Sequence, residues 1–148
     1  MTANSDFIEQ KIIEAIQELL AGKVNELLKK SQFPIPMIEI SKFGYASSIV
    51  PEIALTICEQ TEKERIIRID AFSLTITFNI PETPESELLC YAYAGVVGRA
   101  VHDNPTLGGI VNRAVITGKK YNPPKRPHCG EDWTLVLTLR VTVEGMNK

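Results

Sequence analysis

The segment VHDNPTLGGIV, residues 101–111, gathers a histidine, an aspartate, an Asn-Pro pair and two adjacent glycines. Glycine-rich loops bind phosphate when they follow a strand and open a helix, because free N–H groups and the helix dipole then face the anion. Here the order is reversed, since the glycines follow a predicted helix and precede a predicted strand. A sharp helix-to-strand turn therefore explains the segment better than nucleotide binding, and we expect a positive φ at Gly108 or Gly109.

The cysteines and histidines offer no catalytic pair at a workable spacing. Cys90 and His102 fall on one predicted helix, about 18 Å apart at 1.5 Å per residue. His128 adjoins Cys129 in a predicted loop, and Cys58 lies in the middle of a predicted strand. We therefore expect no catalytic residue and a protein that is not an enzyme. The alternative is a small enzyme or ligand-binding domain with a pocket near His102 and Cys129, which must meet through tertiary folding.

We expect no metal and no cofactor. The chain has no CxxC pair, and its few cysteines and histidines are too scattered for a zinc pattern. The carboxylates fall on predicted helix surfaces and turns, without the paired arrangement in an apolar setting that acid–base catalysis needs.

Length and composition indicate one globular domain over residues 1–148, with 44% hydrophobic and 23% charged residues. The formal net charge of −2 gives the whole molecule no attraction to nucleic acid or anionic lipid. An odd number of widely spaced cysteines favours reduced thiols. The N-terminus lacks the apolar core of a signal peptide, and no apolar run approaches the roughly 20 residues of a membrane helix. We expect a soluble protein inside a cell, without membrane or sequence-specific nucleic-acid partners.

Two helices are predicted. The first runs from about Asp6 to about Leu28, with Asn4 or Ser5 as its cap and a weak point at Gly22. Its apolar face recurs at helical spacing and comprises Ile8, Ile12, Ile16, Leu19 and Leu27. The second occupies much of residues 81–103, with Thr83 as its cap.

Five strands are predicted from alternating apolar residues. They fall within residues 37–43, 52–60, 65–80, 108–121 and 133–145, and the second places Ile53, Leu55 and Ile57 on one face. The order is α-β-β-β-α-β-β. This order predicts an α+β domain, a single antiparallel or mixed β-sheet with two α-helices packed on one face.

The strand over residues 65–80 changes phase near Asp70. Its second half alternates cleanly from Phe72 to Ile80, whereas the apolar residues of its first half fall on the other parity. Either a bulge near Asp70 restores the register, or the first half serves a different surface. The second reading makes this half a candidate oligomer interface, comprising Ile66, Ile67, Ile69 and Ala71.

One basic segment, residues 118–130, combines prolines with cationic side chains. Prolines stiffen a loop and lower the entropy that it loses on binding. The segment is therefore a candidate contact loop, comprising Lys119, Lys120, Tyr121, Lys125 and Arg126. An ordinary exposed hairpin tip is the alternative.

The element order and the segment DNPTLGGIVNRAVI resemble phage tail terminator proteins. In those families a segment of the form D-x-T-LGG-x-V follows the second helix and precedes a strand. It is matched here by Asp103, Thr106, Leu107, Gly108, Gly109 and Val111, with Asn104 and Pro105 filling the gap. The resemblance in element order covers nearly the whole chain. Residues 103–109 are then a structural turn.

The resemblance implies a structural role in a virion. Tail terminators form hexameric rings that cap the finished tail tube and offer a surface to head or neck proteins; they are not enzymes. The expected partners are further copies of this chain, the tail tube protein and a head or neck connector protein. The expected location is the tail of a phage or prophage virion, after assembly in the bacterial host cytoplasm. Another head–tail joining or baseplate component is the structural alternative.

Overall fold

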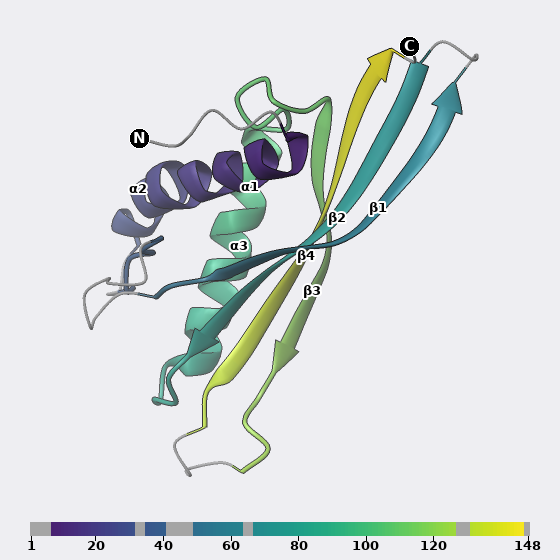
Figure 1. Ribbon diagram of the computed structural model, residues 1–148. Coiled ribbons are helices and arrows are strands. Elements are labelled where there is room, and N and C mark those ends of the chain that lie inside the picture. The colour runs from purple at the N-terminus through teal and green to yellow at the C-terminus, as the bar shows by residue number, and fades with distance from the viewer. Residues whose placement is uncertain (1–6, 32–34, 41–48, 64–66, 127–130, 147–148) are drawn as a thin grey trace.

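Four antiparallel strands form one twisted sheet, and the helices cover one of its faces (Figure 1). This is a computed structural model, and it describes residues 7–31, 35–40, 49–63, 67–126 and 131–146. The elements are α1 (Ile8–Leu19), η1 (Leu20–Val24), α2 (Asn25–Lys29), β1 (Glu52–Lys63), β2 (Ile67–Ile80), α3 (Ser86–Asp103), β3 (Arg113–Asn122) and β4 (Trp133–Met146). The expected α+β class with a single sheet is confirmed.

The strand order is β1-β2-β4-β3, so β1 and β3 are the two edges. Every neighbouring pair is antiparallel, and β2 pairs with β4 without a register shift from Ile67–Met146 to Ile80–Trp133. β2 is therefore not bulged near Asp70. Figure 1 shows one end of β1, β2 and β4 extending past the helices.

The first helix is continuous from Ile8 to Lys29 because α1, η1 and α2 follow one another directly. The turn Leu20–Val24, around Gly22, is π-helical. Buried residues recur every four positions, at Ile12, Ile16, Leu20, Val24 and Leu28. A four-residue repeat drifts around an α-helix with about 3.6 residues per turn, and the wider π turn rotates the later residues back toward the core. The expected caps Asn4 and Ser5 lie outside the described residues.

Residues 37–40, the described part of the strand expected over residues 37–43, are not members of the sheet. Ile38 forms an isolated parallel bridge with Ile49, and residues 41–48 lie outside the described part. The observed order is therefore helix-β-β-α-β-β. Asn25 and Tyr93 hold the segment instead: Asn25 hydrogen-bonds both backbone groups of Ile38, and the Tyr93 hydroxyl donates to the Pro36 carbonyl at 2.5 Å.

α3 begins at Ser86, after a tight hydrogen-bonded turn. The Ser86 hydroxyl accepts the Thr83 N–H at 2.6 Å, and the Thr83 hydroxyl accepts the Glu85 N–H at 3.2 Å. The helix then packs on the sheet, where the rings of Tyr93 and Phe78 stack with centroids 5.3 Å apart. Thr83 thus stabilises the approach to the helix rather than its first turn.

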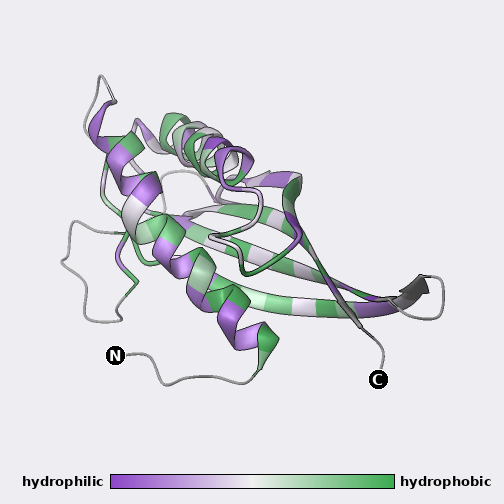
Figure 2. Ribbon diagram, turned by 90° about the horizontal axis from the view of Figure 1, so that it is seen from above, coloured by the Kyte–Doolittle hydropathy of each residue, from purple (hydrophilic) through white to green (hydrophobic). Residues whose placement is uncertain are grey.

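The two faces of the sheet differ in chemistry, as the alternating colours of the strands show (Figure 2). The face toward the helices, here the core face, is lined by Phe72, Leu74, Ile76, Phe78, Ile80, Leu135, Leu137, Leu139 and Val141, all buried. The opposite face, here the outer face, carries Ser73, Thr75, Thr77, Thr138 and Thr142 on the two central strands. The alternation in β2 and β4 thus separates an apolar core face from a mainly polar outer face.

A register shift between Leu55 and Ile57 corrects one prediction. Ile53 and Leu55 pair with Ile76 and Leu74 of the core face, but the extra residue puts Ile57 on the outer face, where it is 53% exposed. Cys58 takes the core-face position instead, opposite Phe72. The bulge that was one alternative near Asp70 is absent, and β1 has a bulge opposite Leu74 and Ser73 instead.

Candidate functional site

The turn between α3 and β3 holds three successive residues with positive φ: Leu107 at 49°, Gly108 at 75° and Gly109 at 89°. The prediction of a positive φ at one of the glycines is confirmed for both. Leu107 is a non-glycine residue in this strained region, and its side chain is buried at 5% exposure. Leu107 thus adopts a positive φ while its side chain is packed in the core. The two glycines that follow adopt positive φ at little cost because they have no Cβ.

Hydrogen bonds within the turn satisfy several of its backbone groups. The Gly109 and Val111 N–H groups both donate to the Thr106 carbonyl, at 3.0 and 3.1 Å. The Asn104 side chain donates to the Ala100 carbonyl at 2.9 Å, and the Ala114 N–H donates to the Pro105 carbonyl at 2.7 Å. At least one glycine N–H is thus already occupied within the turn. This arrangement favours architecture over a phosphate cradle.

The described cysteines are poorly suited to nucleophilic attack. Cys90 is fully buried in α3, and burial, with a smaller contribution from Glu87, raises its thiol pKa to about 11. Desolvation, then the carboxylates of Asp70 and Glu9, raise the pKa of Cys58 as well. A thiol is a nucleophile as its thiolate, so both shifts lower reactivity at neutral pH. Cys129, with its neighbour His128, lies outside the described residues.

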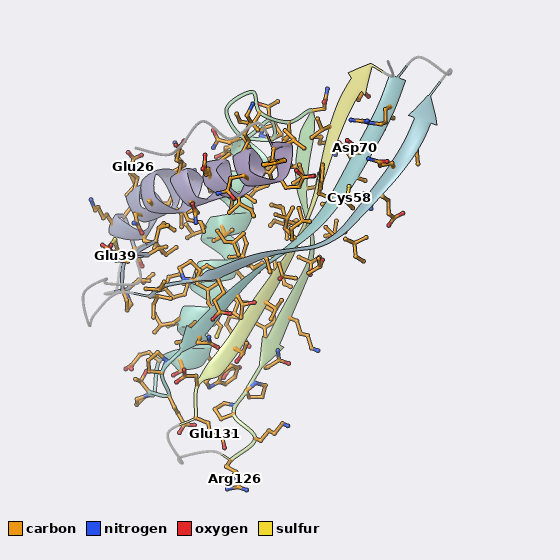
Figure 3. All side chains as sticks on the ribbon, in the orientation of Figure 1. Glu26, Glu39, Cys58, Asp70, Arg126 and Glu131 are labelled. Atoms are coloured by element: carbon orange, nitrogen blue, oxygen red, sulfur yellow. The ribbon has the colours of Figure 1, made fainter. Side chains whose placement is uncertain are left out.

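Asp70 is the buried carboxylate of the extending sheet end. It lies on the core face beside Cys58, and Figure 3 shows the two on neighbouring strands. The Arg68 Nε lies 3.3 Å from Asp70 Oδ1, which has no hydrogen-bond partner among the described residues. Arg68 and Asp70, both on β2, thus form an ion pair, which offsets the cost of burying the Asp70 carboxylate.

The candidate oligomer interface falls on β2, an interior strand. Ile66 lies outside the described residues, and the backbone of Ile67 pairs with Lys63 and Met146. Ile69 and Ala71 both lie on the outer face, away from Phe72, so the first half of the strand does serve a different surface. Ala71 is only 8% exposed and offers little area to another copy, whereas Ile69 is half-buried.

The candidate contact loop is divided between a strand and a loop. Lys119, Lys120 and Tyr121 belong to β3. Tyr121 packs edge-on against Tyr91 of α3, with centroids 5.2 Å apart. Lys125 and Arg126 are exposed in the loop that follows, and Figure 3 shows Arg126 at the end of the molecule opposite Asp70. The five residues therefore belong to two elements, and residues 127–130 of the predicted segment lie outside the described part.

An open groove of about 720 Å³ separates α3 from β3. Its lining includes two glycines and four basic side chains: Gly95, Gly98, Arg99, His102, Arg113 and Lys119. No described carboxylate or thiol lines it, although Arg99 Nε lies 3.8 Å from Asp103 outside the lining. The groove therefore suits an acidic ligand or segment better than acid–base chemistry. It contains His102, as the enzyme alternative requires, but Cys129 cannot be placed in it.

Within the described ranges, no three His, Cys, Asp or Glu side chains are grouped so as to hold a metal ion. The described helices likewise include none that is both long enough and apolar enough to cross a membrane.

The sheet edges carry opposite charges, which the sequence reading missed. Exposed acidic residues Glu52 and Glu59 lie on β1, and exposed basic residues Arg113, Lys119 and Lys120 lie on β3. The charged residues are visible in the sequence. The strand order, which places β1 and β3 at the two edges, is not. Charged residues on edge strands also limit unselective pairing.

Comparison with known proteins adds no family. No family model matches the chain, and no curated protein matches its sequence significantly.

Proposed function

We propose that this protein is a phage tail terminator, a structural subunit that forms a hexameric ring, caps the tail tube and presents an attachment surface to the head or neck. The observation that carries the ring is the pair of oppositely charged sheet edges on one subunit, neither of which pairs with a further strand among the described residues. A closed ring requires two different patches on each subunit, one binding the other on its neighbour.

The uncovered outer face supports a role in assembly. The described helices cover the core face and not the outer face, which is rich in threonine and serine. Apolar side chains interrupt it. Exposed Ile57 and exposed Val115 end one row, and half-buried Ile69 lies on β2, four residues from Ser73 of that row. An outer face that is mostly polar with a few exposed apolar residues is suited to contact with other protein subunits.

The tail role itself depends on the resemblance. The matched turn, residues 103–109, connects α3 to the edge strand β3 and fixes its start through the Pro105–Ala114 hydrogen bond. Because this turn fixes the start of β3, its sequence pattern is expected in proteins that use this edge to form a ring. The groove lined by Arg99 and Lys119 lies beside the same edge.

The test is a complementation assay. Purified protein is added to phage tails that lack their terminator, followed by filled heads, and joined particles are counted. We expect the wild-type protein to restore joining. The double reversal Lys125→Glu with Arg126→Glu is expected to stay folded and impair attachment, because both exposed charges lie in a loop away from the core.

The matched control is Lys29→Glu with Lys30→Glu, a double reversal at the exposed end of the first helix. It is expected to join heads as well as the wild type. Wild-type protein that neither binds the tails nor restores joining would refute the tail role.

A further inference from the structure

The two edges of the sheet complement one another in three rows of the outer face. Following the cross-strand partners from β1 through β2 and β4 to β3, Glu52, Thr77, Val136 and Lys120 lie in one row. Glu59, Ala71, Thr142 and Arg113 lie in another. Each row thus ends in a glutamate on β1 and a basic residue on β3, and all four charged residues share the outer face.

A third row lies between these two. Ile57, Ser73, Arg140 and Val115 are aligned, with exposed apolar residues at both ends, 53% for Ile57 and 36% for Val115. Exposed β-branched residues on edge strands gain contact area only from a partner strand.

The bulges preserve this match. β1 gains one residue between Leu55 and Ile57, and β3 gains one between Ile116 and Gly118. Because each edge has one extra residue, a continuous antiparallel pairing of β1 with β3 of another copy brings all three pairs opposite at once. A register that is shifted along the strand loses all three.

We infer that the β1 edge of one copy pairs with the β3 edge of the next, so that the sheet continues from subunit to subunit. The inference specifies the contact within the proposed ring and depends on that proposal for its biological setting. β1 and β3 run in opposite directions, because every neighbouring strand pair in β1-β2-β4-β3 is antiparallel. Copies related by a rotation that keeps strand direction therefore join antiparallel.

The backbone of each edge sets the extent of pairing. Among the described residues, no backbone hydrogen bond connects β1 to a segment other than β2. On β3 the outward Ala114 N–H already donates to the Pro105 carbonyl. The ladder therefore runs over Val115–Asn122 and ends there, and Glu59 reaches Arg113 through side chains at the mouth of the groove.

Cysteine cross-linking tests the register. Ala54 and Gly118 share a row in the middle of the ladder, and a Cβ at Gly118 makes only ordinary contacts, at 3.8 Å from Thr138. The double variant Ala54→Cys with Gly118→Cys, in a background with Cys58→Ser and Cys129→Ser, is oxidised over a protein concentration series. We expect disulfide-linked dimers and higher ladders under denaturing electrophoresis.

The control places the second thiol two rows away, as Ala54→Cys with Val115→Cys. This displacement is about 7 Å along the strand, beyond the reach of a disulfide. Preferential linking of the 54–118 pair supports the edge contact. Absence of linking at every concentration, or equal linking of the control, overturns it.

A charge exchange gives an independent readout by sedimentation. Glu52→Lys alone and Lys120→Glu alone are each expected to weaken association about tenfold, because like charges then oppose across the strands. The double variant is expected to recover most of the loss, and Glu18→Lys, on the exposed side of α1, is expected to change nothing. Losses that add in the double variant contradict the contact.

The tail assay separates this inference from the proposed function. Wild-type protein that joins heads to tails while the 54–118 pair fails to link would leave the function standing and reject the edge contact. Linked rings that leave tails uncapped would support the edge contact and reject the proposed function.

Discussion

The side-chain amide of Asn25 binds both backbone groups of Ile38: Nδ2 donates to the Ile38 carbonyl at 2.9 Å, and Oδ1 accepts the Ile38 N–H at 2.8 Å. One side chain thus takes the place of a neighbouring strand for a segment that lies outside the sheet. The segment Ile35–Ile38 can close over the helices without a ladder because its polar groups are satisfied there.

We predict that Asn25→Ala lowers the free energy of unfolding by about 1–3 kcal/mol, since two partly buried backbone groups lose their partner. Urea denaturation of purified protein measures the loss. The control is Gln10→Ala, which removes an exposed bond to Glu14 at 3.3 Å and should cost less than about 0.5 kcal/mol. Equal effects of the two substitutions would contradict the role of Asn25.

The glycines of the turn should resist substitution because of their backbone and not because of space. A Cβ at Gly108 or Gly109 meets nothing within 4 Å, yet both have positive φ. We predict that Gly108→Ala and Gly109→Ala each cost about 1–2 kcal/mol of unfolding free energy. Gly95→Ala, in open space on α3, should instead be neutral or stabilise by up to about 1 kcal/mol. Alanine variants as stable as the wild type would show that the turn tolerates a side chain.

Cys58 offers a pH-dependent test of its surroundings. The negative charge of Asp70 raises its thiol pKa, so Asp70→Asn is expected to lower that pKa. A lower pKa gives more thiolate, and alkylation by iodoacetamide at about pH 8 should become faster. Glu59→Gln is the control, because Glu59 contributes least among the charges acting on Cys58. The rate of Cys58 alkylation is measured against pH in a Cys129→Ser background. An unchanged midpoint of this profile in Asp70→Asn would contradict the placement of Asp70 beside Cys58.

The clean alternation of apolar residues predicted β2 from Phe72 onward and nearly all of β4, because a strand with one buried face requires that period. The helix-to-strand turn was also predictable, since Gly108 and Gly109 follow a helix end. In both cases the local sequence pattern and the tertiary structure favour the same conformation.

Other features depend on tertiary position. The bulge in β1 has a sequence signal only in the adjacent apolar pair Ile57–Cys58, which breaks the alternation. Lys119 and Lys120 fell in both the predicted strand within residues 108–121 and the predicted contact loop, and in the structure they are exposed residues of the edge strand β3. The segment near Ile38 has a strand-like pattern, but side chains from α2 and α3 hold it instead.

The outer face near the extending sheet end should contribute to assembly. Ile69 lies there opposite Glu144, so Ile69→Lys gains an attractive charge within the subunit. We predict an unfolding free energy within about 1 kcal/mol of the wild type. Association should weaken at least about tenfold, because an ammonium group loses much more water on burial at an interface than an isoleucine side chain does, even beside Glu144. Sedimentation and urea denaturation measure the two quantities, and unchanged association would remove Ile69 from the interface.

The measurement closest to the central claim is electron microscopy of terminator-deficient tails after purified protein has been added. We predict a hexameric ring at one end of each tail, with the sheets of neighbouring subunits joined through β1 and β3. Tails that remain bare, or that carry the protein without a closed ring, would contradict it.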